Sequence, residues 1–354
     1  MRLDRLRKTL TDHQLDAILV SQPENRRYLS GFSGSAGWLI VLAERAILAT
    51  DFRYYEQTRK EAPDFELAKI RTNFPDLLPD LLSDTAVRRL GFEAQHVSMA
   101  DLHDLASVSD GVEWVPLRDT VETLRSVKDE EEIEALRRSV ALTDAAFAHF
   151  LDLLRPGMTE REAAWEIEAY MRIHGASRVA FDLIVAAGPN SARPHARPSD
   201  HVIEAGEPIV VDIGCVVDGY CSDMTRTLCM GQPAPKYLEV WEIVRQTQEH
   251  AAATIRAGMS GVEADALARD LIAQAGYAKN FGHGLGHGVG LAVHEGPRAS
   301  RTSQDSLLAG MALTVEPGIY LPGEFGVRIE DMVVVRDGGA EILTQTPKMS
   351  LVAL

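Results

Sequence analysis

The sequence predicts an α/β domain over residues 1–122, followed by an α+β domain over residues 123–354. A chain of 354 residues is longer than one typical domain and can bury a large core. The first third alternates helical patterns with apolar runs of strand length. The remainder opens on one long helical pattern and then mixes helices and strands without strict alternation.

The N-terminal domain begins with an amphipathic helical pattern over residues 2–13. Apolar, strand-like runs follow in the order LDAILV, WLIVLA, RAILAT and RLGFE, and they alternate with helical patterns over residues 54–61 and in MADLHDLAS. The glycine-rich GFSGSAG does not match G-x-S-x-G, so we interpret it as a turn rather than a nucleophile elbow. A mostly buried sheet is expected for this domain.

The second domain opens with a helical pattern over residues 126–154, which Pro156 and Gly157 end. Ser126 and Asp129 resemble a capping box, and the following acids suit the first turn of a helix. The later elements are helices and strands in mixed order: TEREAAWEIEAYMRIHG, IVVDIGCVVDGYCSDMTRTLCM, helices over 236–257 and 263–275, a histidine-rich segment, ALTVEPGIYL and GVRIEDMVVVR. We therefore predict an α+β domain.

Composition excludes several classes of partner. The net charge of −16 argues against nucleic acid or an anionic membrane surface. No apolar run approaches the ~18 residues of a transmembrane helix, and the charged N-terminus does not resemble a signal peptide. The three cysteines, Cys215, Cys221 and Cys229, match no structural zinc spacing and no disulfide framework. A cytoplasmic protein is expected.

Two aspartates belong to one predicted hairpin. Asp218-Gly219 is a strong turn signal, and a two-residue turn there pairs residue 212 with 225 and residue 214 with 223. Asp212 and Asp223 then lie on one face as diagonal neighbours. Asp212 interrupts the apolar run IVVDIG, where a carboxylate needs a compensating charge. An ion pair with Arg226 and a bound metal are equally good explanations at this point.

Glu316 and Glu330 each interrupt a further strand-like run, and no comparable set of basic residues accompanies the four acids. Cations would supply the missing charge: four carboxylates balance two divalent ions, which lower the pKa of a bridging water to near neutrality. Oxygen-rich ligation with one histidine favours Mn²⁺, with Co²⁺ or Zn²⁺ as alternatives. The residues thus indicate two-metal hydrolysis.

The segment GHGLGHGVGLAVHE, residues 282–295, holds His283, His287 and His294 and a glycine at every second position from 282 to 290. Such a chain has little bulk, and we expect the glycines to let it pass close to the metal centre. His294-Glu295 does not begin an H-E-x-x-H motif, because residue 298 is arginine, and the glycines do not form G-x-G-x-x-G.

The motifs together resemble one family. D-I-G-C, G-Y-C-S-D-M-T-R-T, H-G-L-G-H-G-V-G-L-A-V-H-E, T-V-E-P-G-I-Y and G-V-R-I-E-D are similar to those of the proline-specific pita-bread metallopeptidases, the group of Xaa-Pro dipeptidase (prolidase) and aminopeptidase P. The resemblance covers nearly the whole chain. It implies a pita-bread catalytic domain after a creatinase-type N-terminal domain that serves substrate-end recognition and oligomerisation, and it implies a homodimer.

The resemblance also implies roles for single residues. Asp212 would hold one metal, Asp223 and Glu330 would bridge both, and His287 and Glu316 would complete the second. Glu316 would also exchange a proton with the attacking water. The outer residues implied are His294 on the tetrahedral intermediate or substrate, His195 over the proline end, His283, Arg328 and Tyr320 lining the site, and Arg298 on a substrate carboxylate.

From the residues alone, interpretations without a functional role stay open for some of these positions. His195 can be a solvated loop histidine, and His283 can be structural. Arg328 shares strand parity with Glu330, so it can simply neutralise that carboxylate.

The leading hypothesis is a dinuclear exopeptidase that hydrolyses the Xaa-Pro bond, with Xaa-Pro dipeptidase favoured over aminopeptidase P on longer Xaa-Pro-Yaa peptides. A proline-containing di- or oligopeptide is thus the expected substrate. Methionine aminopeptidase is disfavoured because it usually lacks an N-terminal domain of this kind. A metal-free creatinase-like or non-catalytic relative is disfavoured because all five metal-ligand positions are present.

Overall fold

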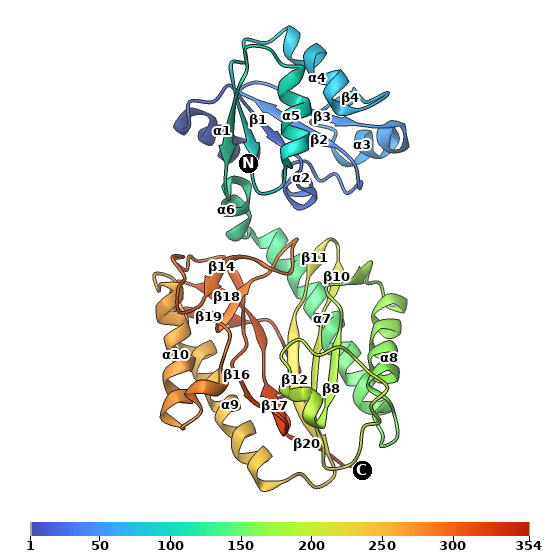
Figure 1. The fold of residues 1–354 in the computed structure, drawn as a ribbon, viewed down its shortest axis with the longest axis vertical. Helices are drawn as coiled ribbons and strands as arrows, with labels where there is room; N and C mark the ends of the chain where they lie inside the picture. The colour runs from blue at the N-terminus through green and yellow to red at the C-terminus, as the bar shows by residue number, and fades with distance from the viewer. Residues whose placement is uncertain (1, 354) are drawn as a thin grey trace. The chain divides into compact units, whose positions relative to one another are not determined.

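The structure is a computed structural model that describes residues 2–353. The chain divides into two compact units, one that runs up to Arg125 and one that starts at Ser126 (Figure 1). The sequence placed this division after Glu122. Within residues 2–353, no helix combines the length and the apolar character needed to cross a membrane.

The N-terminal unit is built on one six-stranded sheet with the strand order β4-β3-β2-β1-β5-β6. The strands are β1 (Ala17–Val20), β2 (Trp38–Leu42), β3 (Ala46–Thr50), β4 (Glu66–Lys69), β5 (Arg89–Glu93) and β6 (Glu113–Leu117). Its helices are α1 (Arg2–Asp12), α2 (Pro23–Ser30), α3 (Tyr55–Glu61), α4 (Phe74–Ser83), α5 (Met99–Ser107) and α6 (Thr120–Ser126), with a 3-10 turn, η1 (Phe52–Tyr54). Every residue of β1 and β3 is buried, as expected for an α/β sheet.

The second unit starts with two helices, α7 (Glu130–Leu153) and α8 (Glu160–Ile173). Helix α7 begins later than the sequence predicted, because its capping box is formed by Asp129 and Glu132 rather than by Ser126 and Asp129. The residues just before it are held in an extended arrangement: Val127 forms a β-bridge with Met311, and Lys128 N donates to the Gly310 carbonyl. The predicted single helical pattern is therefore interrupted between α6 and α7.

The strands of this unit form two main sheets. One has the order β20-β12-β9-β8, from β8 (Ile184–Ala187), β9 (Pro208–Ile213), β12 (Met224–Met230) and β20 (Leu351–Val352). The other has the order β14-β13-β15-β18-β19, from β13 (Gly286–Gly288), β14 (Glu295–Ala299), β15 (Ala312–Val315), β18 (Asp331–Arg336) and β19 (Gly339–Ile342). Smaller sheets are formed by β7 (Arg178–Val179), β10 (Cys215–Val217) and β11 (Tyr220–Cys221), and by β16 (Gly318–Leu321) and β17 (Phe325–Arg328).

Helices flank these strands on two sides (Figure 1). Helices α7 and α8 share an apolar core with β8, β9 and β12. Helices α9 (Pro235–Thr254) and α10 (Gly261–Gln274) share a second apolar core with β15 to β18. Two 3-10 turns, η2 (Gly188–Ala192) and η3 (Ala278–Asn280), complete the unit. Strands thus lie between two layers of helices, so the α+β class predicted for this domain is confirmed.

Candidate metal centre

The hairpin of β9 and β12 places the first two acids as predicted. Asp212 pairs with Thr225, and Val217 pairs with Tyr220, so the chain turns at Asp218-Gly219. Asp218 and Gly219 have φ angles of 53° and 89°, the left-handed conformation that a two-residue hairpin turn requires. Asp223 lies in the short break between β11 and β12, and its side chain is buried.

The remaining candidate ligands come from the other main sheet. Glu330 separates β17 from β18, and its backbone N–H donates to the Thr225 carbonyl, which connects it to the aspartate hairpin. Glu316 follows β15, and its carboxylate accepts a 3.0 Å hydrogen bond from Thr314 Oγ1. His287 lies on β13, which pairs with β15. Separate strands thus position each side chain on rigid backbone.

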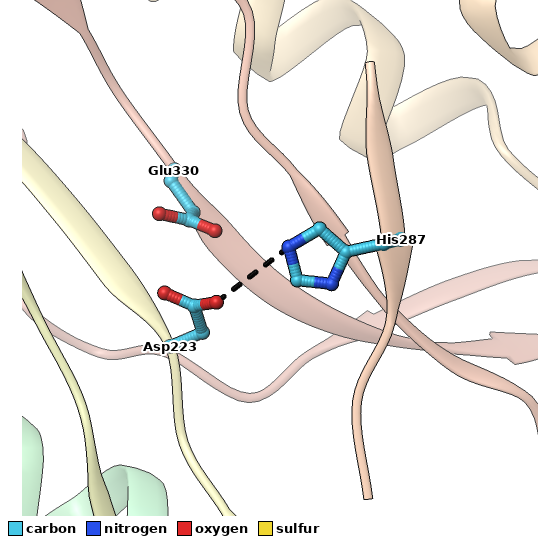
Figure 2. Close-up of side chains that lie close together, drawn as sticks. All are labelled: Asp223, His287 and Glu330. Carbon is cyan, nitrogen blue, oxygen red and sulfur yellow. Dashed lines mark ion pairs between the residues drawn. The ribbon is translucent and has the colours of Figure 1, made fainter. Parts of the chain in front are cut away.

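Three side chains meet closely enough to share a cation. Asp223, His287 and Glu330 each offer a ligand atom, and these atoms all lie within 4.8 Å of one another. Figure 2 shows the three side chains converging from three different segments. His287 Nε2 lies 3.7 Å from Asp223 Oδ2 and 3.3 Å from Glu316 Oε1, so Glu316 joins the same cluster.

Asp212 has a mixed environment. Its Oδ2 accepts a 2.5 Å hydrogen bond from Arg328 Nη2 within an ion pair, while its Oδ1 is buried and has no hydrogen-bond partner in the described chain. Arg226, suggested by the sequence as its partner, instead pairs with Asp331 at 2.7 Å. The sequence suggested that Arg328 neutralises Glu330, but in the structure Arg328 forms its ion pair with Asp212. An orphaned buried oxygen is the expected state of a ligand atom that a cation would satisfy.

Crowding of the acids shifts their ionisation. Burial, and then the neighbouring Glu330 and Asp212, raise the pKa of Asp223 well above its usual value. Burial, and then Glu316 and Asp212, raise the pKa of Glu330 in the same way. Burial also raises the pKa of Glu316 and lowers that of His287, which favours the neutral imidazole a metal needs. This donor set fits divalent cations, whose charge would restore the carboxylates to their ionised form.

A hydrogen-bonded chain leads away from Asp212. Arg328 Nη1 donates to the Tyr320 hydroxyl at 2.8 Å, and that hydroxyl lies 3.0 Å from His283 Nε2. Burial raises the pKa of Tyr320 and lowers that of His283, so both groups are uncharged near neutral pH. The sequence left two interpretations open for His283, a residue that lines the site or a structural one. In the structure it lines the cavity and also contacts the buried Tyr320 hydroxyl.

A cavity of about 440 Å³ opens onto the cluster. Every side chain predicted for the site lines it except Arg298 and Tyr320. His195 and His294 are exposed at this cavity, and the His294 ring packs edge-on against His287 with 4.3 Å between centroids. Arg298 lies on β14 directly opposite His287, and Tyr320 is buried behind Arg328.

Phe181, Ile184 and Arg197 also line the cavity, and the sequence analysis missed them. No motif identifies them. A phenylalanine or isoleucine within the apolar run FDLIVAA is typical of a residue in the hydrophobic core. Ile184 reaches the site because β8 pairs with β9 so that Ile184 lies opposite Asp212. Only this strand pairing places Ile184 at the site, and composition does not predict which strands pair.

Backbone packing requires at least two of the alternating glycines. A Cβ on Gly286 would lie 2.0 Å from the Thr314 carbonyl oxygen, and one on Gly288 would lie 2.0 Å from the Gly296 carbonyl oxygen. Close approach of the neighbouring β14 and β15 backbone excludes side chains at these positions. The expected passage of this chain close to a metal centre stays a prediction.

Two family models cover this chain. The model of metallopeptidase family M24 matches residues 134–337, and that of the creatinase/prolidase N-terminal domain matches residues 2–127. Two relatives illustrate the match in sequence. An uncharacterised peptidase of Bacillus subtilis is 40% identical over 98% of this chain and 99% of its own, and the Xaa-Pro dipeptidase of Pyrococcus furiosus is 36% identical over 98% of each.

Solved structures agree with these matches. The Xaa-Pro dipeptidase from Bacillus anthracis superposes with a TM-score of 0.97 at 40% identity, over 100% of this chain and 99% of that one. An X-Pro aminopeptidase from Thermotoga maritima gives a TM-score of 0.90 at 39% identity, over 96% and 98%. These matches confirm a pita-bread catalytic domain that follows a creatinase-type N-terminal domain in the sequence. They also confirm the use of divalent metal ions that the family implies. The cluster of acids around His287 therefore lies in a chain that belongs to metallopeptidase family M24.

Proposed function

We propose that this protein is a dinuclear metal-dependent exopeptidase that hydrolyses the Xaa-Pro bond, acting as an Xaa-Pro dipeptidase. The observation that carries the proposal is the convergence of Asp223, His287 and Glu330 in the wall of a cavity of about 440 Å³ in an M24 catalytic domain. The names of its relatives supply the substrate class: those from Pyrococcus furiosus and Bacillus anthracis are Xaa-Pro dipeptidases.

In this proposal five residues hold two divalent ions. Asp212 would bind one ion, His287 and Glu316 the other, and Asp223 and Glu330 both. The unpartnered Asp212 Oδ1 and the raised pKa values of Asp223 and Glu330 support this assignment. Mn²⁺ is favoured because the donors are mostly oxygens, with Co²⁺ or Zn²⁺ as alternatives. When bound, such ions polarise a scissile carbonyl and make water a stronger nucleophile.

The side chains around the centre would handle protons and charge. Glu316 is suited to exchange a proton with the attacking water and the leaving proline nitrogen, because its carboxylate lines the cavity beside His287 and Thr314 orients it. His294 is exposed to the cavity, and its pKa is lowered by burial of the ring, so it would donate one N–H to the developing oxyanion as a neutral imidazole. Arg328 holds Asp212 in place through their buried ion pair.

The cavity wall would recognise the proline end of the substrate. Phe181 and Ile184 form an apolar wall beside His195, which suits the flat, apolar proline ring. Arg298 would reach a substrate carboxylate, because cross-strand partners share a face and it lies opposite His287. That carboxylate directly follows proline only in a dipeptide, so Arg298 favours the dipeptidase over aminopeptidase P.

The test compares substrates on metal-loaded protein. Mn²⁺-loaded enzyme should release proline from Ala-Pro faster than it cleaves Ala-Pro-Ala, and it should leave Met-Ala intact. Glu316→Gln should remove about 10²–10⁴-fold of the rate, whereas Glu324→Gln, in an exposed ion pair with Lys236, should not. Faster cleavage of Ala-Pro-Ala would favour aminopeptidase P, and cleavage of Met-Ala alone would refute Xaa-Pro specificity. Absence of bound metal together with no cleavage would indicate a metal-free relative.

We also propose that the protein is a cytoplasmic homodimer, with the N-terminal domain contributing to assembly and substrate-end recognition. The three cysteines are buried as free thiols, which suits a reducing compartment. Light scattering on the purified protein tests the dimer, and a molar mass near that of one chain, 38.8 kDa, would refute it.

A further inference from the structure

A buried ion pair lies directly behind the segment that carries His294. Lys128 Nζ is 2.8 Å from Glu295 Oε1, and the two side chains are only 1% and 4% exposed. Lys128 Nζ also donates to the Ser126 carbonyl at 3.2 Å. Two charges so deeply buried hold each other in place, because separating them removes a close ion pair from a desolvated environment.

The lysine end of this pair is fixed to rigid structure. Lys128 directly precedes Asp129, the N-cap of α7, and its backbone N–H donates to the Gly310 carbonyl at 2.9 Å. The glutamate end lies on the site segment: Glu295 follows His294 in the chain and pairs with Gly288, the residue after His287. One ion pair therefore anchors backbone next to both histidines.

The Glu295 carboxylate also fits closely against the turn that precedes it. A Cβ on Gly290 would lie 2.4 Å from Glu295 Oε1, and Ala292 N–H donates weakly to Glu295 Oε2 at 3.4 Å. The Gly290 carbonyl in turn accepts from Cys221 N–H at 2.8 Å. Residues 290–295 are thus held around this carboxylate.

The His294 imidazole has no such support of its own. Its ring makes no hydrogen bond to any residue among 2–353, and it contacts His287 edge-on. Its place in the cavity therefore depends on its backbone. We propose that Lys128 is a positioning residue, whose buried pair with Glu295 holds residues 290–295 so that His294 faces the metal centre. The effect on turnover rests on the proposed function, whereas the effect on the position of His294 does not.

The experiment compares four variants of the Mn²⁺-loaded full chain: Lys128→Met, Lys128→Arg, the double variant Lys128→Met/Glu295→Gln, and Lys236→Met, which breaks an exposed ion pair in the same unit. The readouts are kcat, KM on Ala-Pro and the melting temperature of the Mn²⁺-loaded protein, together with the imidazole NMR signal of His294. That signal is recorded on the same variants without Mn²⁺, because the ion is paramagnetic, and His294→Ala identifies it by its absence.

Lys128→Met should lower kcat by about 10–100-fold with KM changed less than about threefold, because a displacement near 1 Å of a catalytic group has an effect of that size. Its His294 signal should shift or broaden. Lys128→Arg should keep both kcat and the signal, and Lys236→Met should match wild type. The double variant should regain melting temperature, because Glu295→Gln removes the buried carboxylate whose counter-ion Lys128→Met took away, but it should not regain kcat.

An unshifted His294 signal and normal kcat in a destabilised Lys128→Met protein would overturn the proposal, because the pair would then serve stability alone. Full recovery of kcat in the double variant would overturn it as well, and this variant keeps the test valid if Lys128→Met does not fold. If wild type does not cleave Ala-Pro, the proposed function fails, while the NMR comparison still decides whether Lys128 positions His294.

Discussion

Neutralising one acid of the centre should stabilise the metal-free protein and destroy its response to metal. Asp223 is buried beside other acids, and its carboxylate accepts no hydrogen bond from residues 2–353, so its change to asparagine breaks none. Asp223→Asn removes repulsion from the metal-free fold. It also removes a charged ligand, so bound metal should contribute less to the stability of the variant.

The geometry sets the magnitude. Two carboxylate oxygens 4.8 Å apart repel by about 3 kcal/mol at an effective dielectric constant of about 20. Proton uptake by the folded protein relieves part of this repulsion, so we expect Asp223→Asn to raise the free energy of unfolding by about 1–3 kcal/mol without metal. In wild type, free metal at 100 times its Kd adds about 2.7 kcal/mol per site. In a domain of this size, 1 kcal/mol shifts Tm by about 2–4 °C.

Thermal unfolding of chelated and Mn²⁺-loaded protein measures both effects. Wild type should gain about 10–20 °C from Mn²⁺ at its two sites, whereas Asp223→Asn should start about 2–10 °C higher and gain little. Asp270→Asn, on the exposed side of α10, is the matched control and should behave as wild type. A chelated Asp223→Asn protein that melts below wild type would refute the reasoning, because the acids would then not repel in the empty centre.

Three further outcomes follow from the same contacts. The raised pKa of Asp223 means that the folded metal-free protein binds more protons than the unfolded chain above pH 3.8, the ordinary value. The associated stability is complete at low pH and is lost as pH rises through the raised pKa, whereas the lowered pKa values of His283, His287 and His294 add stability over the same rise. Between pH 5 and pH 8, the melting temperature of chelated wild type should therefore decrease relative to that of chelated Asp223→Asn, which keeps the histidines, and parallel profiles would contradict this. Gly286→Ala should destabilise by about 1–3 kcal/mol in denaturant melts, because its Cβ meets the Thr314 carbonyl, while Gly338→Ala, with open space around it, should not. Tyr320→Phe should destabilise by about 1–3 kcal/mol in the same melts, because Arg328 Nη1 and His283 Nε2 each lose a hydrogen bond to the hydroxyl; an unchanged midpoint would show that neither bond matters.

Local patterns were sufficient to predict the aspartate hairpin. Asp218-Gly219 determines the turn, the turn determines the register, and the register places Asp212 opposite Thr225. Apolar runs interrupted by Glu316 and Glu330 were equally informative, because a buried carboxylate is expensive and needs an explanation. These features depend on neighbours in sequence, where periodicity and turn chemistry operate.

Partners distant in the chain could not be predicted in this way. Strand parity suggested Arg328 for Glu330, and proximity suggested Arg226 for Asp212. The fold instead pairs Arg328 with Asp212 and Arg226 with Asp331, because separate sheets bring these strands together. The break before α7 has the same origin, since a tertiary bridge between Val127 and Met311 overrides a continuous helical pattern.

The position of Arg328 also changes the charge balance of the centre. Its guanidinium satisfies one oxygen of Asp212, so the sequence alternatives of ion pair and metal are not exclusive: each takes a different oxygen. One arginine against four buried carboxylates leaves three negative charges, and the histidines around them are neutral because burial lowers their pKa. A single divalent ion would leave the buried cluster negative. Two would leave one positive charge, which favours an anionic group from solvent or substrate at the centre, and this supports a dinuclear site over a mononuclear one.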